Sequence, residues 1–400
     1  MAASPGRSQL ERLPNELLHN IGSECGIKHL TSLIRCNKDL YDRLYPTLIK
    51  SEVKFNHGRA ALWAVNHGRL GLLRSLHQHG LSITLHWGRE RKAGWIADHD
   101  ILGNCNRKDF IPDPMGKMPI SFSLLHIACS MGLDHIISWL LDYDAVINAA
   151  SSGVNSCAGT GHRYKFPIRE PIAWTPLEMA VCRRRTSSVE LLLERATAEH
   201  GRTAVDGLGC QALHTAVHHG HHEVVDVLLQ SGRYDVNAPN AHNELPVNLR
   251  GPRYRVHLPT LRVLLQAKPD LTIESFCEKS IFFRTRRVPA LPLHDALAAG
   301  EYEAALLLLE AGADATALCG GLYPLHCAFL SGKADEKKDE LSRLRLLMAL
   351  LARGADPNAR SSLDNFTGVT PLMLAAWYAP YPEIIKLFLK HGADVNSVDE

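Results

Sequence analysis

The sequence lacks any long apolar run and has little excess charge. No window of its 400 residues is apolar over the length that is needed to cross a bilayer. The first residues, MAASPGRSQLERLPNE, lack the apolar segment of a secretory signal. The formal net charge is only +2, which gives no general attraction to nucleic acid or to a membrane surface. We therefore predict neither a nucleic-acid partner nor a membrane partner.

Paired cysteines and the common catalytic motifs are missing as well. The ten cysteines are scattered, with no C-x-x-C pair, which favours free thiols in a reducing compartment over disulfides or zinc. We expect a cytoplasmic or nuclear protein. The chain has no G-x-x-x-x-G-K-[ST], no G-x-G-x-x-G after a strand, no H-E-x-x-H and no G-x-S-x-G. We therefore predict no enzyme activity and no catalytic, metal-binding or cofactor-binding residues.

What the sequence does contain is an internal repeat. Residues 211–232 and 291–312 both place a His six residues before a Gly, and a second Gly follows twelve residues after the first. Residues 59–80 keep the same interval between their two Gly residues. Three copies end in Gly-Ala-Asp, at residues 312–314, 354–356 and 392–394.

This spacing predicts two short helices in each copy. Thr175 and Thr370 are suited to cap the first helix, with Pro176 and Pro371 at the first helical position, where a missing N–H costs nothing. The first Gly ends that helix in a left-handed turn, and an amphipathic second helix follows. Neither helix can bury its apolar face alone, so the copies must stack on one another.

The pattern resembles the ankyrin repeat, whose signature is T-P-L-H-x-A. The resemblance implies an all-α solenoid of about eight repeats over residues 57–400, and a function in protein–protein interaction. We expect insertions at 81–120, 149–172 and 333–343, the last of which lengthens a helix. The repeat boundaries stay open around 81–120 and 233–290, because the fifth copy lacks the usual His and Gly.

Residues 9–50, which follow a tail at 1–8 that we expect to be flexible, do not fit the repeat. Leu-Pro begins one helix, and a second helix is expected from near Ile27 through Leu44. The order L-P-x-E-L-L with later apolar positions resembles the F-box, which fungal proteins combine with ankyrin repeats. The resemblance implies docking on the Skp adaptor of a cullin-based ubiquitin ligase. The implied docking residues are Leu13, Pro14, Leu17, Leu18, Ile21, Leu30 and Leu33.

Two functions fit these observations. In the first, the chain is a substrate receptor of a Skp–cullin–F-box ubiquitin ligase, and the repeats bind a protein substrate. In the second, it is an ankyrin-repeat scaffold or inhibitor whose N-terminal helices only cap the solenoid. Adaptor docking requires Leu13, Pro14 and Leu17 to be partly exposed, whereas a cap would bury them against the first repeat. In both cases we expect a monomer apart from its partners, and whether the natural chain continues beyond Glu400 stays open.

Residues 214–222, HTAVHHGHH, hold five histidines and raise the question of a zinc site. His214 is the signature histidine of its repeat, as are His126, His294 and His326. At this position we expect the ring to form a hydrogen bond within its own turn. The other four histidines radiate around a turn, whereas tetrahedral zinc needs convergent ligands. We therefore predict a structural role and no metal.

Aromatic and basic side chains on the repeats are the candidate contacts for a protein substrate, because such residues dominate interface energies. Residues 183–185 are three arginines in a row, where a Gly that separates the helices is expected. Together with the basic clusters at 250–255 and 284–287, they suggest an acidic or phosphorylated segment on the partner. A solvated face is the alternative for the basic clusters. For the aromatic residues, packing between repeats is the alternative. The candidate residues are Trp174, Arg183, Arg184, Arg185, His218, His219, Trp377 and Tyr378.

Overall fold

The computed structural model describes most of the chain. The described residues are 13–25, 27–36, 38–55, 59–83, 86–88, 121–151, 174–200, 209–240, 243–248, 256–276, 289–330, 337–362, 367–378 and 381–399. They form two compact units, Met1–Gly201 and Arg202–Glu400. Within these residues the units are built of helices, apart from two short pairs of strands. The predicted all-α solenoid is confirmed. No described helix combines the length and hydrophobicity that crossing a membrane requires.

The first unit begins with three helices that share a core of their own. They are α1 (Asn15–Glu24), α2 (Ile27–Ile34) and α3 (Lys38–Phe55), and α3 packs on both of the others. The prediction of one long second helix was wrong, because α2 ends at Ile34 and α3 starts at Lys38. This break lets α2 fold back on α3. The core residues are Leu18, Leu30, Ile34, Leu40 and Leu44.

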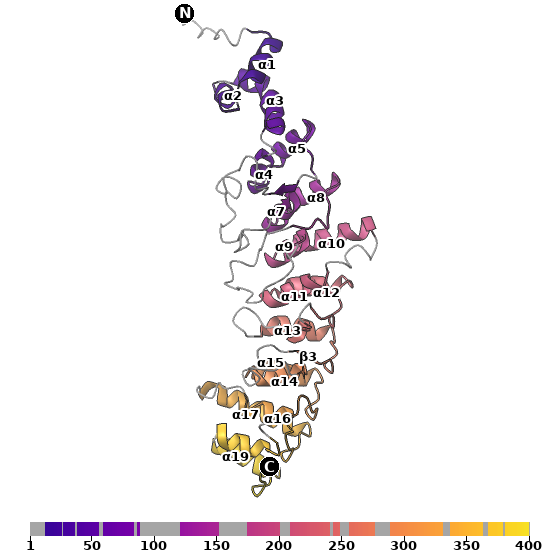
Figure 1. Ribbon diagram of the computed structural model, residues 1–400, viewed down its shortest axis with the longest axis vertical. Helices are drawn as coiled ribbons and strands as arrows, with labels where there is room; N and C mark the ends of the chain where they lie inside the picture. Colours follow the sequence, from indigo (N-terminus) through magenta and orange to yellow (C-terminus); the bar gives the residue numbers. More distant parts are fainter. Residues whose placement is uncertain are drawn as a thin grey trace, which may run out of the picture. The chain divides into compact units, whose positions relative to one another are not determined.

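Pairs of helices follow in the same unit (Figure 1). The inner helices α4 (Arg59–Asn66), α7 (Leu124–Met131) and α9 (Pro176–Cys182) pack side by side. Each is followed by an outer helix: α5 (Leu70–Gln78), α8 (Asp134–Asp142) and α10 (Thr186–His200). Helix α3 also packs on α5, so the N-terminal helices adjoin the first pair.

The two predicted insertions in this unit fall largely outside the described residues. The first begins after α5, where strand β1 (His86–Gly88) pairs antiparallel with β2 (Ser121–Ser123). Residues 89–120 between them lie outside the described part of the chain, and so do residues 152–172 of the second insertion. The strand pair brings the two ends of the first insertion together next to α7.

The second unit stacks helices in two rows (Figure 1). The inner row is α11 (Gly209–His219), the 3-10 turn η4 (Pro246–Asn248), α14 (Pro292–Ala298), α16 (Pro324–Cys327) and α18 (Pro371–Tyr378). The outer row is α12 (His222–Gln230), α13 (Leu258–Gln266), α15 (Tyr302–Glu310), α17 (Lys337–Ala352) and α19 (Pro382–Lys390). A pair of two-residue strands, β3 (Ser275–Phe276) and β4 (Pro289–Ala290), joins the ends of the segment between α13 and α14.

The irregular copies take the places that their sequences indicate. The degenerate fifth copy keeps its outer helix α13 but has only the turn η4 in the inner row. The charged insertion at 333–343 extends an outer helix as predicted, since α17 begins at Lys337 and runs for 16 residues. This extra length gives α17 a large outward face, with Leu341 and Met348 exposed.

In each copy whose turn between inner and outer helix lies among the described residues, one residue of that turn takes a left-handed conformation. Gly132 and Gly220 take φ values of 75° and 71° there, which a residue with a Cβ resists. In the third copy Arg184 occupies this position, with φ of 54°. The period of the fold therefore holds even where the expected Gly is absent, and Arg184 is held in an unfavourable conformation.

Candidate functional site

Helix α1 divides the predicted adaptor-docking residues between a buried and an exposed face. Leu18 and Leu30 lie in the core of the three N-terminal helices, so they hold the helices together and are not on the surface. Leu33 is partly buried against the same core. Leu17 and Ile21 point away from it, with 50% and 38% of their surface exposed. Of the seven predicted docking residues, only Pro14, Leu17 and Ile21 are therefore exposed enough to form the surface that an adaptor would contact.

The start of α1 is fixed by contacts with α3. Pro14 is exposed, and its carbonyl oxygen accepts the first helical hydrogen bond, from the N–H of Leu18 at 3.1 Å. Arg43 on α3 donates to the carbonyl oxygen of Leu13 and to the side-chain oxygen of Asn15. Leu13 itself packs partly buried against the core of the three helices. The contacts of Leu13 and Asn15 with Arg43 therefore hold the beginning of α1 against α3, and Leu17 is directed outward.

The signature histidines connect each repeat to the next one. The Nδ1 atom of His126 accepts the N–H of Ser123 at 3.1 Å, within its own turn, as predicted. Its Nε2 faces the carbonyl oxygen of Trp174 at 3.0 Å. A carbonyl oxygen can only accept, so Nε2 carries the proton and donates it across to the next repeat. This second bond was not predicted from the sequence.

The same bond recurs at the other signature histidines. Nε2 of His214 donates to the carbonyl oxygen of Glu244, and Nε2 of His326 donates to that of Val369. His294 has two carbonyl oxygens within reach, of Ala317 and Leu322. Burial lowers the pKa of His294 and of His326 to about 4, so both rings are neutral at physiological pH. The histidines are structural links between repeats.

The remaining histidines of the 214–222 stretch form ring contacts at the end of α11. The ring of His219 lies edge-on to that of His218, with centroids 5.3 Å apart, and stacks on that of His221 at 5.5 Å. His222 stacks on His257 at 6.1 Å. Among the described residues, no group of three His, Cys, Asp or Glu side chains could hold a metal ion. His218 and His219 stay candidates for contact with a partner.

The three arginines at 183–185 have different positions. Arg185 lies over Gly132 and donates from Nε to the carbonyl oxygen of Ser130 at 3.2 Å, so it packs one repeat on the previous one. Arg184 is exposed in the left-handed turn, and Arg183 is half-buried at the end of α9. The other two predicted basic clusters, 250–255 and 284–287, lie outside the described residues.

The aromatic candidates differ in how much of each side chain is exposed to solvent. Trp174 is buried, and its carbonyl oxygen accepts the bond from His126, so of the two alternatives for this residue the structure has the packed one. Trp377 and Tyr378, at the end of α18, are exposed by 55% and 38%. These two residues are therefore available to a partner, whereas Trp174 stabilises the stack.

Sequence reasoning missed Trp63 on α4. Its indole is half exposed and stacks on the ring of His67, with centroids 4.2 Å apart. It borders a cavity of about 660 Å³ between the N-terminal helices and the first helix pair, together with Tyr45 and Leu72. The signal was present, because Trp63 directly follows the position that holds the signature histidine in other copies.

Comparisons with known proteins agree with this architecture. A family model described as ankyrin repeats (3 copies) matches residues 145–240 and 293–399, which is just over half of the chain. A similar protein is Ankyrin repeat protein nuc-2 of Neurospora crassa, which is 30% identical over 195 residues. That match covers 49% of this chain but only 16% of the relative, so the chain spans a small part of that protein's length.

Proposed function

The chain belongs to the ankyrin-repeat family and is a protein–protein interaction module, and from this premise we propose that it is the substrate receptor of a Skp–cullin–F-box ubiquitin ligase. Helices α1–α3 dock on the Skp adaptor, and the repeats bind a protein substrate. The chain itself catalyses nothing in this proposal. It holds a lysine of the substrate near a reactive thioester that another subunit supplies, which is catalysis by proximity. A cytoplasmic or nuclear location is part of the proposal.

One observation carries the proposal: α1 exposes apolar residues that the core of the three N-terminal helices does not use. Leu18 is 2% exposed within the core of α1–α3, and its neighbour Leu17 is 50% exposed. Exposed Leu17 and Ile21 lie one helical turn apart on the same face of α1, beside the exposed Pro14. An apolar surface of this kind is typical of a site for another protein.

The alternative role as a solenoid cap makes a different demand on these residues. A cap would bury Pro14 and Leu17 against the first repeat, whereas both are exposed. Leu13 is partly buried, but against the core of the N-terminal helices. It is α3 that packs on the helix α5 of the first repeat. The arrangement favours a docking unit that is attached to the array through α3 and free on its α1 face.

For the substrate, the exposed Trp377 and Tyr378 are the strongest candidates on the repeats. Large aromatic side chains give much contact area for little conformational entropy and are enriched in interface hot spots. They lie on the last inner helix, α18, next to the C-terminal helix α19. We propose that a protein substrate contacts this part of the array.

Co-purification with a Skp adaptor tests the proposal. The chain is co-expressed with the adaptor, as wild type and as Leu17→Glu/Ile21→Glu. Each new carboxylate would have to be desolvated at an apolar interface. We therefore expect the variant to bind the adaptor at least about a hundredfold more weakly than wild type. Because both side chains are exposed in the isolated chain, the variant should keep the wild-type circular dichroism and thermal stability.

Leu389→Glu is the matched control, since Leu389 is also exposed and apolar but lies on α19. It should bind the adaptor like wild type. Failure of the intact chain to bind any Skp adaptor, or equal binding by the α1 variant and the control, would contradict the proposal. Either result would leave an ankyrin-repeat scaffold with a helical cap.

A further inference from the structure

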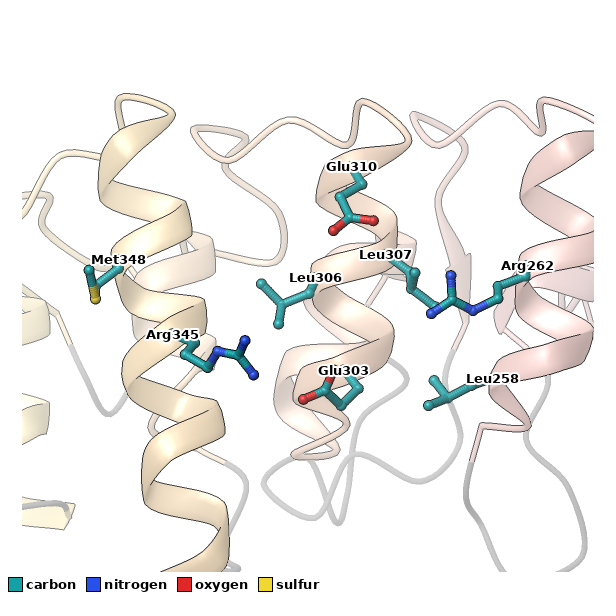
Figure 2. A pocket seen from close by; sticks show the side chains of 8 residues that line it. All are labelled: Leu258, Arg262, Glu303, Leu306, Leu307, Glu310, Arg345 and Met348. Carbon is teal, nitrogen blue, oxygen red and sulfur yellow. The ribbon is translucent and has the colours of Figure 1, made fainter.

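The outer helices of Arg202–Glu400 carry a groove that the proposed function does not use. Helices α13, α15 and α17 pack side by side, and their outward faces enclose about 430 Å³ (Figure 2). Its centre is apolar: Leu306, partly buried, comes from α15, and Met348, 54% exposed, comes from α17. With the partly buried Leu258 of α13 they leave an apolar strip on the outside of the stack, and the buried Leu307 lies beneath it.

Four charged side chains border this strip. They are Arg262 from α13, Glu303 and Glu310 from α15, and Arg345 from α17, and all four are exposed. Figure 2 shows Glu303 and Glu310 toward the two ends of α15, with the two arginines reaching toward α15 from the helices on either side. Within the described part of the chain, none of the four forms an ion pair. The charges alternate in sign around the apolar centre without neutralising one another.

The spacing of the two carboxylates selects the kind of partner. Glu303 and Glu310 are seven residues apart on α15, which is about 10.5 Å along the helix axis. A second helix lying along α15 repeats the same face at this interval, with residues three and four positions along in between. A strand presents one face only every ~6.7 Å, so its same-face residues would fall at about 6.7 and 13.4 Å. The spacing therefore matches a helix and not an extended peptide.

We propose that this groove binds an amphipathic helix of a partner protein, aligned with α15. Two basic residues of that helix, two turns apart, pair with Glu303 and Glu310. Apolar residues between them contact Leu306 and Met348, and acidic residues on its flanks pair with Arg262 and Arg345. The charges around the groove determine which helix is bound and in what register, because a helix of the opposite pattern would bring like charges together.

A synthetic helical peptide of about four turns is the probe. It carries two lysines two turns apart, leucines between them on the same face and glutamates on both flanks. Fluorescence anisotropy measures its binding to the full chain. We expect binding that weakens as salt is added, because the ion pairs are exposed at the rim of the groove. Glu303→Lys/Glu310→Lys should weaken it at least about tenfold.

A second peptide, with the two lysines changed to glutamates, should show the reverse preference and bind the Glu303→Lys/Glu310→Lys variant better than wild type. Glu190→Lys/Glu383→Lys is the matched control, because it changes the net charge by the same amount at exposed positions that do not line the groove. It should bind the first peptide like wild type.

Three outcomes would overturn the proposal. The first is that neither peptide binds. The second is that the first peptide binds the groove variant and wild type equally. In the third, light scattering shows that the wild-type chain self-associates and that Glu303→Lys/Glu310→Lys abolishes it, which would make a second copy of the chain the occupant. None of these results depends on the Skp adaptor, so they leave the proposed function untouched.

Discussion

His126 donates a hydrogen bond from Nε2 to the backbone carbonyl oxygen of Trp174, at 3.0 Å, across 48 residues of sequence. The acceptor lies two residues before the next inner helix, α9, begins. His214 and His326 repeat the arrangement with Glu244 and Val369, which also lie two residues before the next inner element. At His126 and His326 the other ring nitrogen, Nδ1, accepts an N–H of the histidine's own turn, so each of these rings joins its own turn to the following repeat. At His294 the expected bond within the turn is missing, because its buried Nδ1 has no hydrogen-bond partner among the described residues.

The first prediction concerns acid stability. Burial holds the pKa of His326 at about 4, below the 6.5 of an unfolded chain, so the native state binds fewer protons between these values. The contribution of His326 to the free energy of unfolding is therefore fully present above pH 6.5 and is lost as the pH falls toward 4. The loss through His326 is about 2 kcal/mol at pH 5. Urea unfolding followed by circular dichroism at pH 7.5 and pH 5 measures it.

His326→Gln removes the titrating ring while keeping a side chain that can donate to Val369. The difference in unfolding free energy between pH 7.5 and pH 5 should shrink by about 2 kcal/mol in this variant. The same substitution at His391, an exposed residue after α19, controls for the change of residue type. An unchanged pH dependence in His326→Gln would show that the ring does not resist protonation.

Glu178 gives the second prediction, with the opposite sign. It replaces the signature histidine in the third copy and is buried, and its carboxylate accepts the N–H of Thr175 at 2.8 Å. Burial raises its pKa to about 7 from 4.5. The native state therefore binds more protons between these values, so stability is highest below pH 4.5 and falls as the pH rises through 7. At pH 8 the ionised group costs about 3 kcal/mol.

Glu178→Gln should accordingly stabilise Met1–Gly201 at pH 8 by up to about 3 kcal/mol and have little effect at pH 4.5. The amide still accepts the N–H of Thr175. Five of the six tryptophans lie in this unit, so tryptophan fluorescence during urea unfolding reports on it. Glu178→Ala, which loses the bond to Thr175 as well, is the control and should gain less. A gain from Glu178→Gln that is equal at both pH values would rule out the titration.

The sequence predicts much of this fold because its determinants are local. The interval from His to Gly and from Gly to Gly is set by the length of a short helix and its turn, so it can be counted without knowing any long-range contact. The period even tolerates Arg184, since the fold imposes φ of 54° on it. By contrast, the break between α2 and α3 follows from how α1 and α2 both pack on α3, which the apolar pattern alone does not specify.

The candidate sites were less predictable because exposure depends on neighbours. Trp174 lies just before the inner helix α9 and Trp377 lies on the inner helix α18, yet Trp174 is buried and Trp377 is exposed. The docking residues were predicted as one set, but the helical period of α1 turns Leu17 outward and Leu18 inward. The groove on α13, α15 and α17 could not be foreseen, because its charges come from repeats whose spacing depends on insertions between them.

A third prediction follows from Arg184. A non-Gly residue in the left-handed region costs about 1 kcal/mol, and glycine occupies the equivalent turn at Gly132 and Gly220. Arg184→Gly should therefore raise the unfolding free energy of Met1–Gly201 by about 0.5–1 kcal/mol. Arg183→Gly is the matched control, because Arg183 has φ of −91° and gains nothing from glycine. Equal effects of the two changes would contradict the role of the backbone conformation.

The last prediction concerns a polar contact inside the second unit. Arg343 on α17 donates from Nε to the hydroxyl of Tyr302 on α15 at 2.8 Å, and both side chains are buried. The guanidinium carbon also lies 5.4 Å from the centre of the tyrosine ring. Tyr302→Phe keeps the ring but leaves a buried donor without its acceptor, which should lower the unfolding free energy by about 1–3 kcal/mol.

A double-mutant cycle separates this bond from the other contacts of the two residues. Arg343→Met alone removes the donor and the charge, and adding Tyr302→Phe to it should then cost clearly less than Tyr302→Phe costs in the wild-type chain. This difference measures the coupling between the two helices, because no polar pair is left to break in the second background. If Tyr302→Phe costs the same in both backgrounds, the hydroxyl stabilises the protein through another contact and not through Arg343.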